Sequence, residues 1–438
     1  MGTISRPEGR RRTRRASRVT VALTMLLALS TLLSCGGTGG VVGPDTPGPD
    51  ADDPEPAGAL AVVTSTVAGG LDEDGFVVTV DGSDERTVAA DDTTVVTGLT
   101  PGDHTVALTG VEGDCSLETE EALGATIAAG DTVSVVFEAV CRLRDRIVFG
   151  SNRGGTSDIW VVDADGASPP ERILETPGRS EDPAVSPDGT RIVFVRAASG
   201  EDNDDLWIME ADGSHPVALT ETGGAEGSPA WSPDGTRIAF QYTGLSPGPT
   251  GADTDVVVAG TDGADRDPVA ASTDFDGDPA WSPDGTRLAF ASTRQGNADI
   301  WVAEVDGDAE PVKLTGDDAV HRQPTWSPDG TRVAYRSGQG STPEIHVACV
   351  NGAIPPENLT ENASFDGEPA WSPGGELIAF TSKRDGGVDL HVMGADGSDP
   401  VRLTDAAGND RDAAWSPRGA SGPGPRPGPG GECQVAAP

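Results

Sequence analysis

Acidic residues recur at fixed positions along the second half of the chain, each just before a short proline-containing motif. The residue directly before the motif forms a set that we call the mouth ring: Asp182, Ser228, Asp278, Gln323, Glu368 and Asp412. Two residues earlier stands a second set, the upstream set: Ser180, Glu226, Asp276, His321, Asp366 and Asp410. If the repeats surround one axis, several carboxylates converge there. Converging carboxylates repel one another, and they attract hard cations or basic side chains.

We therefore predict a binding site at the mouth of a central channel, formed by seven acidic residues: Asp182, Asp276, Asp278, Asp366, Glu368, Asp410 and Asp412. Its ligand would be a basic partner segment or a Ca²⁺ ion. The structural alternative is that these acids cap turns or pair with Arg179, Arg322 and Arg411.

The residue types do not assemble a familiar catalytic centre. The five histidines are scattered, and no Gly-x-Ser-x-Gly elbow occurs. We predict no catalytic residue and favour a non-catalytic role. The competing hypothesis is a metal-dependent hydrolase or lactonase at the channel mouth, because such an enzyme would show the same acidic ring. Whether a metal is bound stays open.

One decapeptide, Trp231 to Phe240, organises the repeats. It reads Trp-Ser-Pro-Asp-Gly-Thr-Arg-Ile-Ala-Phe, in which Pro-Asp-Gly is typical of a tight turn between two short strands. Its serine recurs every 44 to 50 residues, at positions 186, 232, 282, 327, 372 and 416. A fixed period in the forties with several short strands per unit is typical of propeller blades.

Each repeat continues with a strand such as Ile238 to Phe240, a third strand, an Asp-Gly or Asn-Gly turn and a fourth strand that ends in Leu-Thr in most units. An acidic residue opens every third strand, and we call these residues the third-strand set: Asp158, Asp205, Asp255, Asp299, Glu344 and Asp389. We expect their side chains to hold loop backbone. We expect the tryptophans of the motif to pack between blades as core residues.

The two ends of the repeat region complement each other. The chain enters at Ile147 without a preceding Trp-Ser-Pro strand, and it leaves after Trp415 without a following strand. We predict that residues 413–416 complete the sheet begun at Ile147, which removes an open sheet edge. This closure predicts a six-bladed β-propeller over residues 143–419.

The repeats resemble the PD40 or TolB-type propeller repeat, whose consensus runs close to Pro-Ala-Trp-Ser-Pro-Asp-Gly-x-x-Ile-Ala-Phe. The departures are Val185 for tryptophan, Gly374 for the turn aspartate, and Arg418 in the last unit. The resemblance implies a six-bladed propeller used mainly as a binding platform. TolB itself is a soluble periplasmic partner of envelope proteins, but we do not expect any segment of this sequence to form TolB's N-terminal α/β domain.

The first 34 residues are typical of an export signal. Arginines precede an apolar run from Val19 to Leu33 that is short for a membrane span, and Leu32-Leu33-Ser34-Cys35 resembles the bacterial lipobox. The resemblance implies lipidation of Cys35 and a location in the bacterial cell envelope, outside the cytoplasmic membrane. Residues 35–58, rich in Gly, Pro and Asp, are expected to form a disordered tether. Whether the membrane is the inner or the outer one stays open.

Residues 59–142 alternate in short runs typical of a β-sandwich of about six strands, with a segment from Leu99 that resembles PEGA-like modules. In an exported protein we expect a disulfide between Cys115 and Cys141. We also expect one between Cys349 and Cys433, because the Pro/Gly-rich tail (420–438) could reach back.

The composition excludes one class of partner. With 71 acidic and 30 basic residues, the formal net charge is −41, which would repel nucleic acid. We therefore predict an all-β, monomeric envelope lipoprotein that binds a protein or peptide partner, touches the membrane through its lipid, and requires no cofactor unless Ca²⁺ occupies the mouth.

Overall fold

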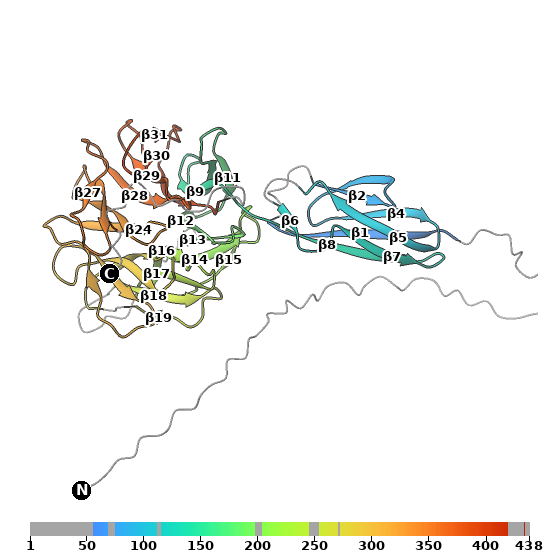
Figure 1. Cartoon of the computed structure of the whole chain (residues 1–438), viewed down its shortest axis with the longest axis horizontal. Helices are drawn as coiled ribbons and strands as arrows, with labels where there is room; N and C mark the ends of the chain where they lie inside the picture. Colours follow the sequence, from blue (N-terminus) through green and yellow to red (C-terminus); the bar gives the residue numbers. More distant parts are fainter. Residues whose placement is uncertain are drawn as a thin grey trace, which may run out of the picture. The chain divides into compact units, whose positions relative to one another are not determined.

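The computed structural model describes residues 56–68, 75–111, 115–197, 204–244, 254–269, 272–418 and 433 (Figure 1). Every named element in these residues is a β-strand, which confirms the all-β class. The predicted signal segment, Cys35 and almost all of the tether lie outside the described residues, as does the tail apart from Cys433. Within the described ranges, no helix has the length and apolar character needed to cross a bilayer.

The N-terminal strands form two four-stranded sheets. One has the order β4 (Thr93–Leu99), β1 (Gly58–Val67), β8 (Thr132–Cys141), β6 (Cys115–Leu117). The other has the order β3 (Asp84–Val88), β2 (Phe76–Val80), β5 (Gly102–Thr109), β7 (Ala122–Ile127). The period-two pattern places alternate residues inside, so that side chains of both sheets, among them Leu60, Phe76 and Phe137, share one buried core.

This region has more strands than the sequence predicted. Strands β3, β6 and β7 were missed because they carry few of the β-branched and aromatic residues that mark a strand. The disulfide between Cys115 and Cys141 is confirmed: the two cysteines face each other in register across β6 and β8.

Six four-stranded antiparallel sheets follow in the described part of the chain. In four-strand order from the inside outward they are β32 (Asp410–Trp415), β9 (Arg146–Ser151), β10 (Asp158–Asp163), β11 (Glu171–Leu174); then β12 (Arg179–Val185), β13 (Arg191–Ala197), β14 (Asp204–Glu210), β15 (Val217–Ala218); then β16 (Ala225–Trp231), β17 (Arg237–Thr243), β18 (Thr254–Gly260), β19 (Asp267–Pro268). The last three are β20 (Asp276–Trp281), β21 (Arg287–Ser292), β22 (Asp299–Glu304), β23 (Val312–Lys313); β24 (His321–Trp326), β25 (Arg332–Ser337), β26 (Glu344–Cys349), β27 (Glu357–Asn358); and β28 (Asp366–Trp371), β29 (Leu377–Ser382), β30 (Asp389–Gly394), β31 (Val401–Arg402).

The innermost strands contact one another in cyclic order, β12, β16, β20, β24, β28, β32 and back to β12. The predicted closure is confirmed, because β32 pairs with β9 and places Trp415 opposite Ile147. The first sheet is thus made from both ends of the repeat region, so that β9 is not left as an edge strand.

A separate hydrophobic cluster fills each interface between neighbouring sheets. The cluster between the sheets of β13 and β17, for example, contains Val193, Leu206, Trp231 and Phe240. The motif tryptophan also links sheets through its indole: Trp231 Nε1 donates to the Ala184 carbonyl of the preceding sheet at 3.1 Å. The tryptophans are therefore core residues, as the sequence predicted.

The Ser-Pro-Asp-Gly-Thr-Arg motif forms a closed hydrogen-bonded turn. Asp234 Oδ1 accepts hydrogen bonds from Ser232 Oγ at 2.6 Å and from the amide and hydroxyl of Thr236. Ser232 Oγ in turn accepts the Arg237 amide at 2.9 Å. The Arg237 guanidinium then stacks on Trp281 of the next sheet, 4.9 Å from its ring centroid. One decapeptide thus fixes both the turn and the contact with its neighbour.

The Leu-Thr pair lies just beyond the fourth strand and not at its end. Strand β15 ends at Ala218, and Thr220 Oγ1 accepts the Leu206 amide at 2.8 Å. The threonine hydroxyl thus satisfies a backbone donor of the third strand.

Candidate functional site

The mouth ring lines one cavity at the inner ends of the six sheets. The cavity has a volume of about 260 Å³, and its lining consists of the six mouth-ring residues and the residue that follows each: Pro183, Pro229, Pro279, Pro324, Pro369 and Ala413. Four of the predicted site residues, Asp182, Asp278, Glu368 and Asp412, are thus brought together.

A β-bulge in every inner strand directs these side chains to the cavity. In β20, Gly277 pairs with Ala291 and Ala280 with Ala289, so that Asp278 and Pro279 together stand opposite one residue. Every mouth-ring residue adopts a left-handed conformation, with φ between 47° and 55°. Because this conformation is unfavourable for residues with a side chain, the surrounding contacts must hold it.

A chain of side-chain to backbone hydrogen bonds supplies those contacts. Each runs from the amide of one mouth-ring residue to a side-chain oxygen of the preceding sheet: Ser228 to Asp182 (3.3 Å), Gln323 to Asp278 (3.2 Å), Glu368 to Gln323 (3.3 Å) and Asp412 to Glu368 (3.2 Å). Ser228 is too short for this role, and Gln241 Oε1 accepts the Asp278 amide at 3.4 Å in its place. These bonds explain why acids and glutamine occupy the ring.

The ring carries less negative charge than its composition indicates. Burial raises the pKa of Asp182 and of Asp278, and it raises the pKa of Asp412 well above its usual range. For Asp412 the nearby carboxyls of Glu368 and Asp182 add to the effect of burial, because like charges at close range disfavour the charged form.

Arginines balance the other side of the ring. Arg322 Nη1 lies 3.9 Å from Asp278 Oδ2, and Arg411 Nη1 lies 3.4 Å from Glu368 Oε1. The half-buried Arg336 also faces Asp278 and Glu368, which oppose the lowering of its pKa by burial. Arg179 pairs instead with Asp204 and Glu181. The pairing predicted as the structural alternative thus holds for Arg322 and Arg411.

The upstream residues Asp276, Asp366 and Asp410 do not line the cavity, and their assignment to the channel mouth is wrong. All three are fully buried within the sheets, where each pairs with an arginine of the neighbouring strand's loop: Arg294 (3.0 Å), Arg384 (2.9 Å) and Arg153 (2.6 Å). In a regular strand, residues two apart share a face. The β-bulge in each inner strand, at Asp278 and Pro279 in β20, interrupts this alternation.

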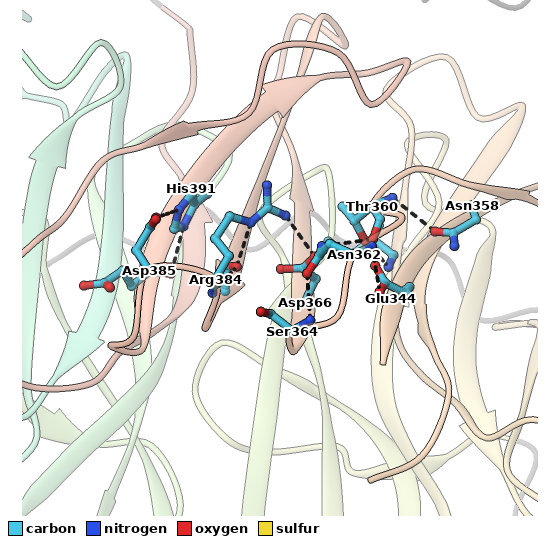
Figure 2. A network of polar contacts seen from close by, with 12 residues as sticks. Glu344, Asn358, Thr360, Asn362, Ser364, Asp366, Arg384, Asp385 and His391 are labelled. Carbon is cyan, nitrogen blue, oxygen red and sulfur yellow. Dashed lines mark hydrogen bonds and ion pairs between the residues drawn. The ribbon is translucent and has the colours of Figure 1, made fainter. Parts of the chain in front are cut away.

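The third-strand set and the upstream set meet at the interfaces between sheets. Figure 2 shows one interface, where the Asn362 amide donates to Glu344 Oε1 at 3.2 Å and its side chain contacts Asp366, which Arg384 holds from the other side. The prediction that third-strand acids hold loop backbone is correct here. Asp158 and Asp205 likewise accept the amides of Thr176 and Thr222.

Two features of the site were not predicted from the sequence. Gln241 and Arg336 act at the cavity although they lie in second strands, and nothing in the repeat marks them. The arginines that neutralise the upstream acids could have been found, because Ser-x-Arg follows the second strand only in the repeats with Asp276, Asp366 and Asp410.

The cavity is suited to binding a group that donates hydrogen bonds or carries positive charge. Its lining offers carboxylates, an amide and a hydroxyl, and it includes no histidine, cysteine or lysine. In the part of the chain that the structure describes, no group of three or more His, Cys, Asp or Glu side chains is arranged to hold a metal ion. Sheets of four antiparallel strands around an axial cavity define the chain as a β-propeller repeat protein.

Comparison with known proteins gives the type of repeat. Residues 250–360 match the family described as TolB beta propeller domain, PD40. TolB from Acinetobacter baumannii is similar in structure, with a TM-score of 0.55 at 22% identity over 63% of this chain and 67% of that one. Hydrazine synthase from Kuenenia stuttgartiensis has a TM-score of 0.51 at 15% identity over 62% of this chain and 46% of its own. No curated protein sequence matches the chain. Residues 250–360 therefore match the TolB-type propeller repeat, and the fold of the chain is similar to that of TolB.

Proposed function

We propose that this chain is an envelope lipoprotein whose propeller is a non-catalytic binding platform. In this proposal a lipid on Cys35 anchors the chain, residues 36–58 form a tether, and residues 59–142 form a β-sandwich spacer. Residues 143–419 form a six-bladed propeller closed by its last strand. The six sheets with cyclic contacts between inner strands support the blade number, and the shared core of the first eight strands supports the sandwich.

The observation that carries the proposal is the convergence of Asp182, Asp278, Glu368 and Asp412 on one cavity of about 260 Å³. Because the ring's backbone is already fixed by the hydrogen bonds between sheets, the cavity needs little ordering on binding. A lysine or arginine side chain presented by an envelope protein or peptide would find carboxylates at its positive end and proline rings along its stem.

The test is capture of partners from detergent-solubilised envelopes with the full-length chain. We expect Asp278→Asn together with Glu368→Gln to reduce capture at least tenfold, since each loses a carboxylate inside the cavity. Glu310→Gln, which removes an exposed acid outside the cavity lining, is the matched control and should capture as the parent does.

The same variants separate the platform from the competing hydrolase or lactonase hypothesis. Loss of captured partners with no change in any hydrolytic turnover supports the platform. Loss of a bound divalent ion together with turnover on a lactone or ester substrate would establish the enzyme and refute the proposal.

A further inference from the structure

The interfaces between sheets repeat one polar arrangement. A third-strand acid accepts the amide of a loop residue, and that residue's side chain contacts the upstream residue of the next sheet. In the interface of Figure 2 these are Glu344, Asn362 and Asp366. In the interface between β14 and β16, the Thr222 amide donates to Asp205 Oδ1 at 3.2 Å and its hydroxyl donates to Glu226 Oε1 at 2.5 Å.

Most acids in these interfaces have a cation at one of two recurrent positions. Arginines two residues beyond a second-strand serine neutralise the upstream acids Asp276, Asp366 and Asp410. A basic residue in the fourth strand forms an ion pair with a third-strand acid in three sheets: Arg172 with Asp158 (3.4 Å), Lys313 with Asp299 (2.7 Å) and Arg402 with Asp389 (2.9 Å).

The interface between β14 and β16 has two acids and neither cation. The fourth-strand residue opposite Trp207 is Ala218, where Lys313 stands opposite Trp301. Beyond the second strand β17, Gly244 occupies the position that Arg294 holds after β21. Arg266, an exposed residue, acts on Glu226 only through its charge. The carboxyl groups of Asp205 and Glu226 therefore lie in this interface without an ion-paired cation.

The Glu226 side chain is buried and incompletely bonded. The residue is 3% exposed, and its Oε2 has no hydrogen-bond partner. Burial and the neighbouring Asp205 carboxyl together raise the pKa of Glu226 to about 7. Asp276 and Asp366 also have an unpartnered oxygen, but an arginine neutralises each of those carboxylates.

We propose that Glu226 and Asp205 bind a Ca²⁺ ion that joins the β12–β15 sheet to the β16–β19 sheet. A divalent ion balances the two carboxylates, as arginine and lysine do in the other interfaces. The Thr222 hydroxyl and the Gly224 carbonyl, 3.4 Å apart, lie beside Glu226 and add the neutral oxygens that a hard cation takes as further ligands. This site is separate from the mouth cavity and does not depend on the proposed function.

The experiment is calorimetric titration of CaCl₂ into the chelator-treated, full-length chain at pH 8. We expect Glu226→Gln and Asp205→Asn each to weaken Ca²⁺ binding at least tenfold. Glu368→Gln, which alters the mouth ring alone, should retain it and so excludes the cavity as the source of the signal. Binding should also weaken at pH 6, because a proton then competes for Glu226.

Thermal unfolding gives a second measurement that needs no variant. Ca²⁺ at a hundredfold excess over its dissociation constant should raise the Tm of the parent by roughly 5 °C or more at pH 8, and Glu226→Gln should abolish this rise. Absence of a Ca²⁺-dependent rise in the parent, or equal Ca²⁺ binding by Glu226→Gln and parent, would overturn the proposal. If the interface binds only a proton and no Ca²⁺, the Tm of the parent will not rise with Ca²⁺.

Discussion

Replacing Arg294 by methionine should expose how strongly one buried ion pair supports the propeller. Arg294 Nη2 lies 3.0 Å from Oδ2 of Asp276, a residue with no solvent exposure. Its Nε donates to Ser292 Oγ at 2.8 Å, and the guanidinium stacks on Trp301 at 5.2 Å. Methionine keeps most of the side chain's apolar volume, so the substitution chiefly removes the charge and its hydrogen bonds.

The expected cost follows from what remains behind. Removing one partner of a buried pair leaves an uncompensated charge and costs about 3–5 kcal/mol in unfolding free energy. Lost stacking on the aromatic ring accounts for roughly 0.5–1 kcal/mol of this.

The assay is guanidinium unfolding followed by tryptophan fluorescence for four proteins: the parent, Arg294→Met, Asp276→Asn and the double variant. The double variant should recover much of the loss, because neither charge is then left alone. Arg418→Met is the control. Its pair with Glu376 is partly exposed, with 35% and 38% of the two side chains accessible, and should contribute less than about 1 kcal/mol. A cost of Arg294→Met below about 1 kcal/mol, or a double variant no more stable than the single one, would refute this reasoning.

Three further predictions address pH, the C-terminal disulfide and the tryptophans. In calcium-free buffer Glu226 has a folded pKa of about 7 against an ordinary value of 4.5. Its contribution to stability, about 3 kcal/mol, is therefore present below pH 4.5 and is lost as the pH rises to 7. The unfolding free energy measured in urea should fall with pH across this range, and Glu226→Gln should remove this dependence. The predicted disulfide between Cys349 and Cys433 is confirmed and closes 84 residues, including the closing strand β32. Cys349→Ser should lower the unfolding free energy by about 4–5 kcal/mol in the chain-entropy account. An unfolding free energy equal to that of the parent within the error of the measurement would contradict this prediction. Trp326 Nε1 donates to the Ala280 carbonyl at 3.1 Å, whereas Trp371 Nε1 has no hydrogen-bond partner. Trp326→Phe should therefore lower the unfolding free energy by about 1 kcal/mol more than Trp371→Phe does. Equal losses in calorimetry would show that the indole hydrogen bonds do not contribute to stability.

The mouth ring shows how far a repeated sequence can predict a site. Equivalent positions in equivalent sheets must lie around the axis, so the convergence of Asp182, Asp278, Glu368 and Asp412 followed from spacing alone. The net charge of the mouth ring was harder to predict. That the pKa of Asp412 lies well above its usual range, and that Arg336 faces the ring from a second strand, depends on burial and on residues remote in sequence.

The upstream set shows where sequence reasoning fails. Asp276 and Asp278 are two residues apart, and regular alternation assigns them to the same face. The bulge at Asp278 and Pro279 adds one residue, so Asp278 turns into the cavity while Asp276 stays inside the sheet with Arg294. A bulge is maintained by contacts from neighbouring sheets, such as the Asp278 amide to Gln241, and no local pattern reports them.

The sequence by itself determined the strand-turn-strand unit, its recurrence, the closure by the last strand and the two cysteine pairs. The unit depends on contacts within about ten residues, and its recurrence and closure depend on a count of equivalent units. The cysteine pairs followed from the small number of cysteines in a chain expected to be exported. Only the tertiary structure decided which carboxylates meet the cavity, which are neutralised, and that Glu226 and Asp205 lie together without an arginine. Those outcomes depend on side chains from neighbouring sheets, whose burial and charge exist only once the ring has closed.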